Sequence, residues 1–298
     1  MTNENEIVID LSHVSKKYGQ HAALDDVTYQ VRKGSVFALL GENGAGKTTT
    51  IRILLGLCEP DGGERSVLGI DSKMNDLKIR QSVGYVPEQP ILYDWMTVAE
   101  TGLFAASFYS DGFMERYDRW LKEYDLRPDA KIKSLSKGQR AKVSLSAALS
   151  HDPELLILDE PTSGLDAMVR REFLESMVDR AATGRTVFLS SHQIAEVERV
   201  ADTIAIMKKS KMLLIESLES LKSRTRSIML TFDGDIPVWN REPLMEQVIE
   251  QRVDGRELRM LGHGIREDVD QVLKEHPNVV RYEIRTPSLE EIFVSYMK

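Results

Sequence analysis

The sequence GENGAGKTTT, residues 41–50, directly follows the apolar run SVFALL at residues 35–40. Its first eight residues match the pattern G-x-x-x-x-G-K-[ST]. The apolar run predicts a short buried strand, and TTIRILLGL at residues 49–57 has the spacing of a helix. Strand, glycine-rich loop and helix therefore occur in the order that a phosphate-binding loop requires.

The residue types in this loop explain what it is able to bind. Glycines let successive backbone N–H groups turn toward an anion, and the helix that follows points its positive dipole end at the same place. Lys47 is placed to reach the β- and γ-phosphates of a nucleotide, and the Thr48 hydroxyl is a ligand for Mg²⁺. A glycine-rich turn without a ligand is the alternative. The loop residues predicted to bind nucleotide are Gly41, Glu42, Asn43, Gly44, Ala45, Gly46, Lys47, Thr48 and Thr49.

Two acidic residues end the apolar run LLILDEP at residues 155–161. Carboxylates at the end of a buried strand are costly unless they handle a cation or a proton. Asp159 is suited to hold Mg²⁺, directly or through water, and Glu160 is suited to act as general base on an attacking water. A strand that merely ends in an acidic surface turn is the alternative.

Composition limits the remaining possibilities. The formal net charge of −8 and the pI of about 5.4 speak against nucleic-acid binding through a basic face. Cys58, the single cysteine of the 298 residues, fits a reducing compartment. The first ten residues lack the pattern of a signal peptide, and no apolar run approaches the ~18 residues that span a bilayer.

Alternating strands and helices predict the fold class. They argue for an α/β core with a mainly parallel sheet, preceded by a strand-rich stretch and interrupted by a helical block at about 97–150. From about residue 216 the pattern changes to a small α+β domain. There we expect strands at 227–232, 257–261 and 279–285 and helices at 217–224, about 242–251, 266–275 and 288–297.

The stretch SLSKGQRAKVSLSAAL, residues 134–149, predicts a helix that starts near Ser136–Gly138. Serine is a natural cap there, and the free N–H groups of the first turn are able to bind an anion. An ordinary capped amphipathic helix is the alternative.

The ordered set GENGAGKTT, LSKGQ, LLILDEP, SGLD and SSH resembles the nucleotide-binding subunit of an ATP-binding cassette (ABC) transporter, over roughly residues 5–220. The stretches GYVPEQPILYDWMTV and PSLEEIFVSYM are similar to subunits that serve separately encoded ABC-2-type export permeases. The resemblance implies an ABC-type P-loop NTPase with an antiparallel β subdomain. We expect the ATPase domain at 1–215, with its helical subdomain at about 90–150, and a C-terminal domain at 216–298.

The resemblance also implies that two cassettes, identical or different, close head to tail around two ATP molecules. Ser136, Gly138 and Gln139 would contact the nucleotide of the other subunit, and Asp166 of SGLD would lie at the interface. Lys137 departs from the family, because glycine is usual at this position.

Within one cassette, the resemblance assigns three further positions. Tyr18 would stack on adenine, although a core tyrosine is the alternative, and His192 would sense the γ-phosphate. For the glutamine-loop residue that binds Mg²⁺, Glu88 is favoured by its position, and Gln89 is the alternative.

The implied activity is ATP hydrolysis that drives a transmembrane permease, with the chain held at the cytoplasmic face of the membrane by that partner. Export is favoured over import by family likeness, and no nucleic-acid partner is expected. Three alternatives stay open: a soluble ABC ATPase, a regulatory nucleotide switch with little turnover, and a P-loop kinase or GTPase. LSKGQ and His192 argue against the last of these.

Overall fold

The computed structural model describes residues 6–71, 75–109, 112–234, 236, 244–276 and 278–298. The chain divides into two compact units, Met1–Ile215 and Glu216–Lys298.

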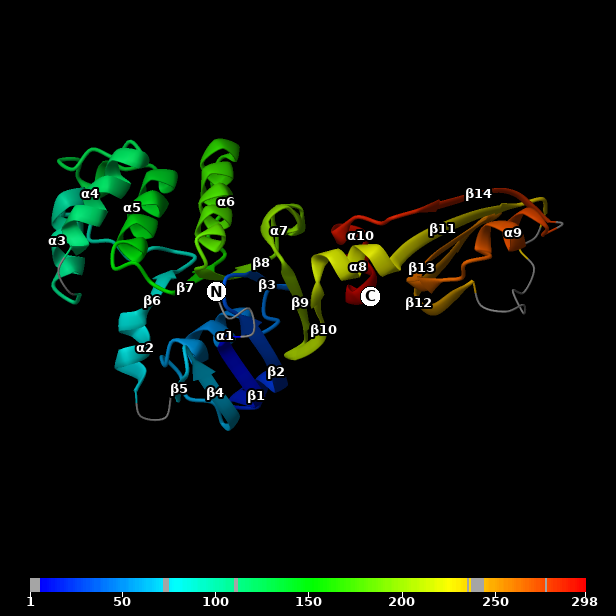
Figure 1. Ribbon diagram of the computed structural model, residues 1–298, viewed down its shortest axis with the longest axis horizontal. Coiled ribbons are helices and arrows are strands. Elements are labelled where there is room, and N and C mark those ends of the chain that lie inside the picture. The colour runs from blue at the N-terminus through cyan, green and yellow to red at the C-terminus, as the bar shows by residue number, and fades with distance from the viewer. Residues whose placement is uncertain (1–5, 72–74, 110–111, 235, 237–243, 277) are drawn as a thin grey trace. The chain divides into compact units, whose positions relative to one another are not determined.

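A six-stranded sheet forms the centre of the first unit, with the strand order β10-β9-β3-β8-β7-β6 (Figure 1). The pairs from β9 to β6 are all parallel. Every residue of β3, β7 and β8 is buried, as expected for parallel strands covered on both faces. The predicted α/β core is therefore confirmed. The strands are β3 (Val36–Gly41), β6 (Val83–Val86), β7 (Leu155–Asp159), β8 (Thr186–Ser191), β9 (Thr203–Lys208) and β10 (Lys211–Ser217).

The first unit also contains an antiparallel sheet with the order β2-β1-β4-β5. Its strands are β1 (Ile7–Tyr18), β2 (His21–Arg32), β4 (Gly62–Val67) and β5 (Ile70–Asp71). Helix α1 (Lys47–Leu54) contacts both sheets, and its buried side chains share one core with them. Tyr29 of β2 stacks on Phe37 of β3, with ring centroids 5.3 Å apart. This core fixes the P-loop, because β3 and α1 flank it.

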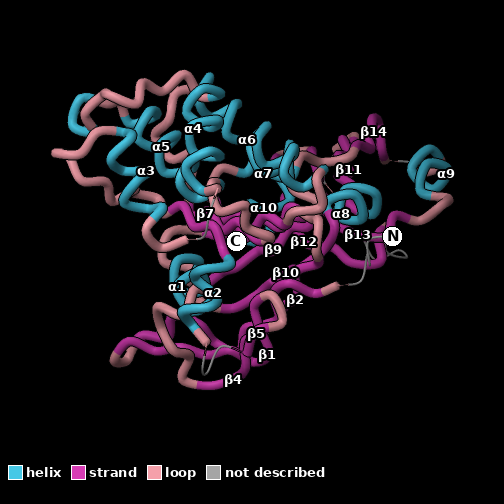
Figure 2. The backbone as a smooth tube through the Cα atoms, turned by 60° about the vertical axis from the view of Figure 1, so that its left-hand side comes forward, coloured by secondary structure: helices cyan, strands magenta, loops and turns pink. Residues whose placement is uncertain are grey.

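Helices cover the rest of the first unit. Helices α6 (Ala167–Ala182) and α7 (Ile194–Val200) pack on the central sheet, and α3 (Val98–Ala106), α4 (Phe113–Glu123) and α5 (Lys137–Leu149) contact one another. Figures 1 and 2 show these three helices together, and α5 contacts β6. The helical block expected at 97–150 is therefore present. The short elements α2 (Asp76–Ser82) and η1 (Ile132–Ser134), like β4, β5 and β10, had not been predicted.

The second unit contains a four-stranded antiparallel sheet with the order β12-β13-β11-β14. The elements are α8 (Leu218–Arg224), β11 (Thr225–Phe232), β12 (Met245–Asp254), β13 (Glu257–Ile265), α9 (Val269–Lys274), β14 (Val279–Arg285) and α10 (Leu289–Met297). Its core contains Ile228, Leu230 and Phe232 of β11 together with Leu273 of α9.

The helix expected at about 242–251 is wrong. Residues 242–243 lie outside the described residues, and Met245–Asp254 form strand β12. Asp254 pairs with Glu257 across a two-residue turn whose Gly255 has a φ of 57°. This hairpin turn joins β12 to β13, so cross-strand pairing overrides the helical propensity of the glutamate- and glutamine-rich segment. Gly255, the first of the two turn residues, was the signal in the sequence.

Candidate nucleotide-binding site

The loop between β3 and α1 has the backbone geometry that its glycines allow. Gly44 and Gly46 have φ values of 81° and 116°, in the left-handed region that favours glycine. A Cβ atom at Gly46 would lie 2.5 Å from the carbonyl oxygen of Ala23. Helix α1 begins at Lys47, directly after this turn. The loop therefore presents the first turn of α1 in the manner of a phosphate-binding loop.

Lys47 is buried at the base of the loop, with 6% of its surface exposed. Its ammonium group donates to the carbonyl oxygen of Gly41 at 2.7 Å and to that of Glu42 at 3.3 Å. It also forms an ion pair with Glu160, with 3.1 Å between Nζ and Oε1. The P-loop lysine and the predicted general base are thus direct partners.

Asp159 and Glu160 stand at the carboxyl end of β7, beside β8. The hydroxyl of Ser190 donates to Asp159 Oδ1 at 2.6 Å. The Glu160 N–H donates to the carbonyl oxygen of Ser190 at 3.1 Å, and Glu160 has a φ of 47°. Backbone in this region is unfavourable for a non-glycine side chain and is typical of functional sites. Sequence reasoning missed Ser190, although it lies in the stretch before His192.

His192 contacts Glu160 from the end of β8. Its Nδ1 lies 2.7 Å from Glu160 Oε2, and its backbone N–H donates to the same oxygen at 3.2 Å. About half of the His192 side chain is exposed. Lys47, Glu160 and His192 therefore form one continuous chain of polar contacts, with one end buried and the other open.

A cleft of about 370 Å³ lies over these groups. The loop residues Gly41 and Ala45 are buried and support it from below, and Asp159 is buried beside Glu160. Three lining residues had not been predicted: His21, Ala23 and Ser163. The predicted residues that line the cleft are Tyr18, Glu42, Asn43, Gly44, Gly46, Lys47, Thr48, Thr49, Glu88, Glu160 and His192.

Tyr18 lines the cleft from the end of β1 and is 46% exposed. Its hydroxyl lies 3.4 Å from Cys58 Sγ, a contact that raises the pKa of Tyr18. The Lys16 ammonium lies 5.8 Å from the ring centroid. The tyrosine is therefore not a core residue, and it borders the cleft.

The two candidates for the glutamine loop lie in different places. Glu88 lines the cleft, whereas Gln89 lines a neighbouring pocket of about 180 Å³, which Glu88 also borders. Both side chains are exposed. Glu88 is thus the one that faces the site, together with the exposed hydroxyl of Thr48. Carboxylate and hydroxyl oxygens from Glu88, Thr48 and Asp159 suit a hard cation such as Mg²⁺.

A second group of predicted residues lies at the N-termini of α5 and α6, outside the cleft. Ser136 caps α5, and Gln139 completes a capping box with it. Asp166 caps α6 by accepting from two backbone N–H groups. Gly138 packs against Val169 of α6, where a Cβ would lie 3.1 Å from a methyl group. LSKGQ and SGLD therefore form one surface, and the Lys137 ammonium lies against Gly164 of SGLD.

Known proteins resemble this chain in sequence. The family model described as ABC transporter matches residues 24–163. The Nod factor export ATP-binding protein I of Burkholderia orbicola is 31% identical, with 96% of this chain and 95% of that protein covered. The chain belongs to the ABC transporter ATP-binding protein family. A further relative, the linearmycin resistance ATP-binding protein LnrL of Bacillus subtilis, is 34% identical over 76% of each chain.

Solved ABC structures share the fold of the first unit. The ATP-binding subunit of an ABC transporter has a TM-score of 0.68 and 33% identity, and the match covers 72% of this chain and 92% of that one. A dimeric cassette in a post-hydrolysis state, bound to ADP and Pi, has a TM-score of 0.64 and 25% identity, covering 70% and 98%. Among the described residues, no helix has the length and apolar character to cross a membrane.

Proposed function

We propose that this chain binds and hydrolyses Mg²⁺-ATP and thereby powers a separately encoded transmembrane permease, as the motor of an exporter. The observation that carries the catalytic part is the contact chain Lys47–Glu160–His192 under the cleft. It joins a P-loop to a carboxylate and an imidazole at the carboxyl edge of a parallel sheet, where α/β proteins bind their ligands.

Binding begins with an exchange of partners at Lys47. The triphosphate carries more charge than one carboxylate, and the N–H groups at the start of α1 add further donors. The β- and γ-phosphates would therefore take over the Lys47 ammonium from Glu160, 3.1 Å away. Thr48, Asp159 and Glu88 would hold Mg²⁺, which when bound offsets the charge of the phosphates.

Glu160 is then the group that handles the proton of the attacking water. Released from Lys47, its carboxylate still receives the His192 backbone N–H on Oε2. His192 Nδ1, 2.7 Å from that oxygen, keeps the carboxylate oriented. The other ring nitrogen, on the exposed side, would contact the γ-phosphate, as a donor when the imidazole is doubly protonated, so His192 links the base to the phosphoryl group that is transferred.

Dimer closure would complete the site. Ser136 and Asp166 are exposed at two adjacent helix starts, and Gly138 brings the backbone of α5 close to α6. A second copy or a different cassette would place this surface over the γ-phosphate. The dimeric relative bound to ADP and Pi supports this arrangement. ATP binding then favours the closed dimer, and hydrolysis releases it.

An aromatic patch supports the permease partner. Tyr93 contacts both Trp95 and Phe104, and Phe104 contacts Phe108, with centroids 5.4–5.8 Å apart. All four are exposed, Trp95 at 66% and Phe108 at 61%, so they are not core of the helical subdomain. Exposed aromatic side chains in contact are typical of an interaction site. A helix of a membrane partner, laid against this patch, would keep the chain at the cytoplasmic face of the membrane.

Phosphate release by the purified chain, measured with and without Mg²⁺, tests the enzymatic part. We expect turnover that requires Mg²⁺ and saturates with ATP. ATP binding without Mg²⁺-dependent turnover, in the chain alone and with its membrane partner, would favour a regulatory switch over a motor. Absence of ATP binding would contradict the proposal as a whole.

A further inference from the structure

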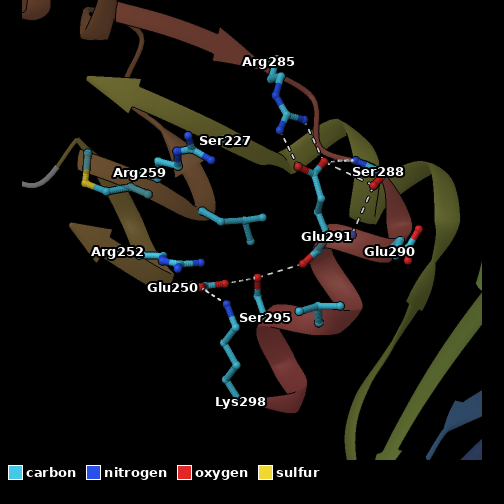
Figure 3. Close-up of a pocket in the computed structure, with 13 residues that line it drawn as sticks. Ser227, Glu250, Arg252, Arg259, Arg285, Ser288, Glu290, Glu291, Ser295 and Lys298 are labelled. Atoms are coloured by element: carbon cyan, nitrogen blue, oxygen red, sulfur yellow. Dashed lines mark hydrogen bonds and ion pairs between the residues drawn. The ribbon is translucent and has the colours of Figure 1, made fainter. Parts of the chain in front are cut away.

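A hollow of about 400 Å³ lies in the second unit, between one face of its sheet and helix α10 (Figure 3). The strands β11, β12, β13 and β14 supply one wall, and α10 supplies the other. This C-terminal hollow lies within Glu216–Lys298 and shares no residue with the nucleotide cleft. Its lining contains three arginines and three glutamates, so the ion pairs among them decide which charges are left to bind a ligand.

The acidic residues nearest α10 already have cationic partners. Glu250 of β12 pairs with Lys298 and accepts from the Ser295 hydroxyl at 2.6 Å. Glu291 of α10 is held by both guanidinium nitrogens of Arg285, one of them at 2.8 Å. These contacts lower the pKa of both carboxyls, that of Glu291 to about 2. The two ion pairs hold the helix against the sheet, and Glu250 also attracts Arg252 at longer range.

Two arginines lie directly opposite each other on the neighbouring strands β12 and β13. Arg252 of β12 pairs in register with Arg259 of β13. Arg259 contacts Glu257 at 3.0 Å, while Arg252 has no hydrogen-bond or ion-pair partner among the described residues. Like charges directly opposite on neighbouring strands destabilise a sheet. An anion between them removes this repulsion, and Figure 3 shows both side chains on the sheet side of the hollow.

The floor between the arginines and α10 is apolar. Leu261 of β13 is buried and Val294 of α10 faces the same space, whereas Met260 packs into the core on the other face of the sheet. Glu290 is exposed at the edge, and in Figure 3 its side chain points away from the two arginines. The hollow therefore combines a cationic row with an adjoining apolar surface, within one cavity.

We infer that the C-terminal hollow binds a phosphate monoester, with its phosphate between Arg252 and Arg259 and its organic part on Leu261 and Val294. A guanidinium presents a planar fork of donors that matches phosphate oxygens, and two forks suit a dianion. The Ser227 hydroxyl, in the same lining, is a further donor. This binding site goes beyond the proposed ATPase function and does not depend on it.

Calorimetric titration of the full chain with phenyl phosphate tests the inference, with excess ADP present to fill the nucleotide cleft. We expect one site per chain and weaker binding of inorganic phosphate, which has no apolar part. Arg252→Gln and Arg259→Gln should each raise Kd at least about tenfold, since each removes charge-assisted hydrogen bonds. Arg281→Gln is the matched control, because Arg281 is an exposed arginine of the same sheet outside the hollow.

Vesicles distinguish a soluble ester from a lipid headgroup. The chain is sedimented with phosphatidylcholine vesicles that contain phosphatidic acid. If it binds these vesicles, and if Arg252→Gln loses this binding while Arg281→Gln retains it, the phosphate is that of a lipid. Phenyl phosphate binding without vesicle binding would identify a soluble ester. Binding of neither probe, or equal effects of all three substitutions, would overturn the inference.

Thermal unfolding provides an independent check that the variants fold. In phosphate-free buffer, Arg252→Gln removes both the repulsion from Arg259 and the attraction to Glu250, so its Tm should stay close to that of the parent chain. Phenyl phosphate should then raise the Tm of the parent and of Arg281→Gln, but not that of Arg252→Gln. No rise in the Tm of the parent chain with phenyl phosphate, or an equal rise in Arg252→Gln, would contradict the inference.

Discussion

Glu160 connects the phosphate-binding lysine to the histidine at the end of β8, because one of its oxygens pairs with Lys47 and the other with His192. Glu160→Gln keeps the shape of the side chain and removes both its charge and its basicity. We expect hydrolysis to slow by about 10²–10⁴-fold. ATP affinity should hold or rise, since Lys47 no longer exchanges an ion pair for the phosphates. Phosphate release and nucleotide titration measure the two effects separately.

Accumulation of an ATP-bound dimer in Glu160→Gln, seen by light scattering, would complete that result. Hydrolysis at the parent rate would show that Glu160 is not the base. Glu175→Gln serves as the control, because Glu175 is an exposed glutamate on α6 whose partner is Arg171.

Lys47 is the cation that the P-loop directs at the phosphates. Lys47→Ala should weaken ATP binding by about tenfold or more, because it removes charge-assisted contacts to the nucleotide. The same change leaves the buried Glu160 without its ion pair, which by itself is destabilising. The double variant Lys47→Ala/Glu160→Gln separates the effects, since it should recover stability but not affinity. An unchanged ATP Kd in the folded variants would contradict the P-loop assignment.

Glu88 and Gln89 differ in position and so should differ in effect. Glu88 lines the cleft, while Gln89 lines the neighbouring pocket. Glu88→Ala should therefore raise the Mg²⁺ concentration needed for half-maximal turnover, and Gln89→Ala should leave it unchanged. The reverse pattern would assign the glutamine-loop role to Gln89. Sequence alone could not decide between adjacent residues, because motif spacing does not show which side chain faces the site.

At the scale of elements, His151 joins the segment after α5 to the segment before α4. Its ring stacks on Tyr109, with centroids 4.2 Å apart, and burial lowers the pKa of His151 to about 4. Because the folded pKa lies below the unfolded value of about 6.5, protonation favours the unfolded chain. Stability from the neutral ring is complete above pH 6.5 and is lost as pH falls toward 4.

We therefore expect the free energy of unfolding to fall by about 1 kcal/mol or more between pH 6.5 and 4. His151→Phe keeps the stack and cannot be protonated, so it should lose less over this range. His21→Phe, at an exposed histidine, should behave as the parent chain does. Urea unfolding at several pH values measures this, and identical pH profiles for parent and His151→Phe would refute it.

The helices and strands also show which parts of the fold the sequence predicts and which it does not. The buried parallel strands β3, β7 and β8 follow from continuous apolar runs, and the cap of α5 follows from Ser136. Strand β12 was missed because its polar face and its glutamates read as helix, while its pairing with β13 is a non-local contact. The ion pair between Lys47 and Glu160 joins residues that the chain separates widely, so only the folded sheet reveals it.

For the whole molecule, a role as transporter motor requires a partner in the membrane. The aromatic patch of Tyr93, Trp95, Phe104 and Phe108 is the proposed contact. Replacing Trp95 and Phe104 with serine should abolish association with that partner while ATP binding persists, because neither residue lines the cleft. Val178→Ser on α6 is the control for loss of an exposed apolar side chain.

The most direct test is affinity purification of the tagged chain from detergent-solubilised native membranes, with identification of the proteins that co-purify. We expect a stoichiometric chain with several membrane spans, lost in the Trp95/Phe104 variant and retained in Val178→Ser. Recovery with soluble proteins alone, and nothing from the membrane fraction, would contradict the transporter assignment and favour a soluble ABC ATPase.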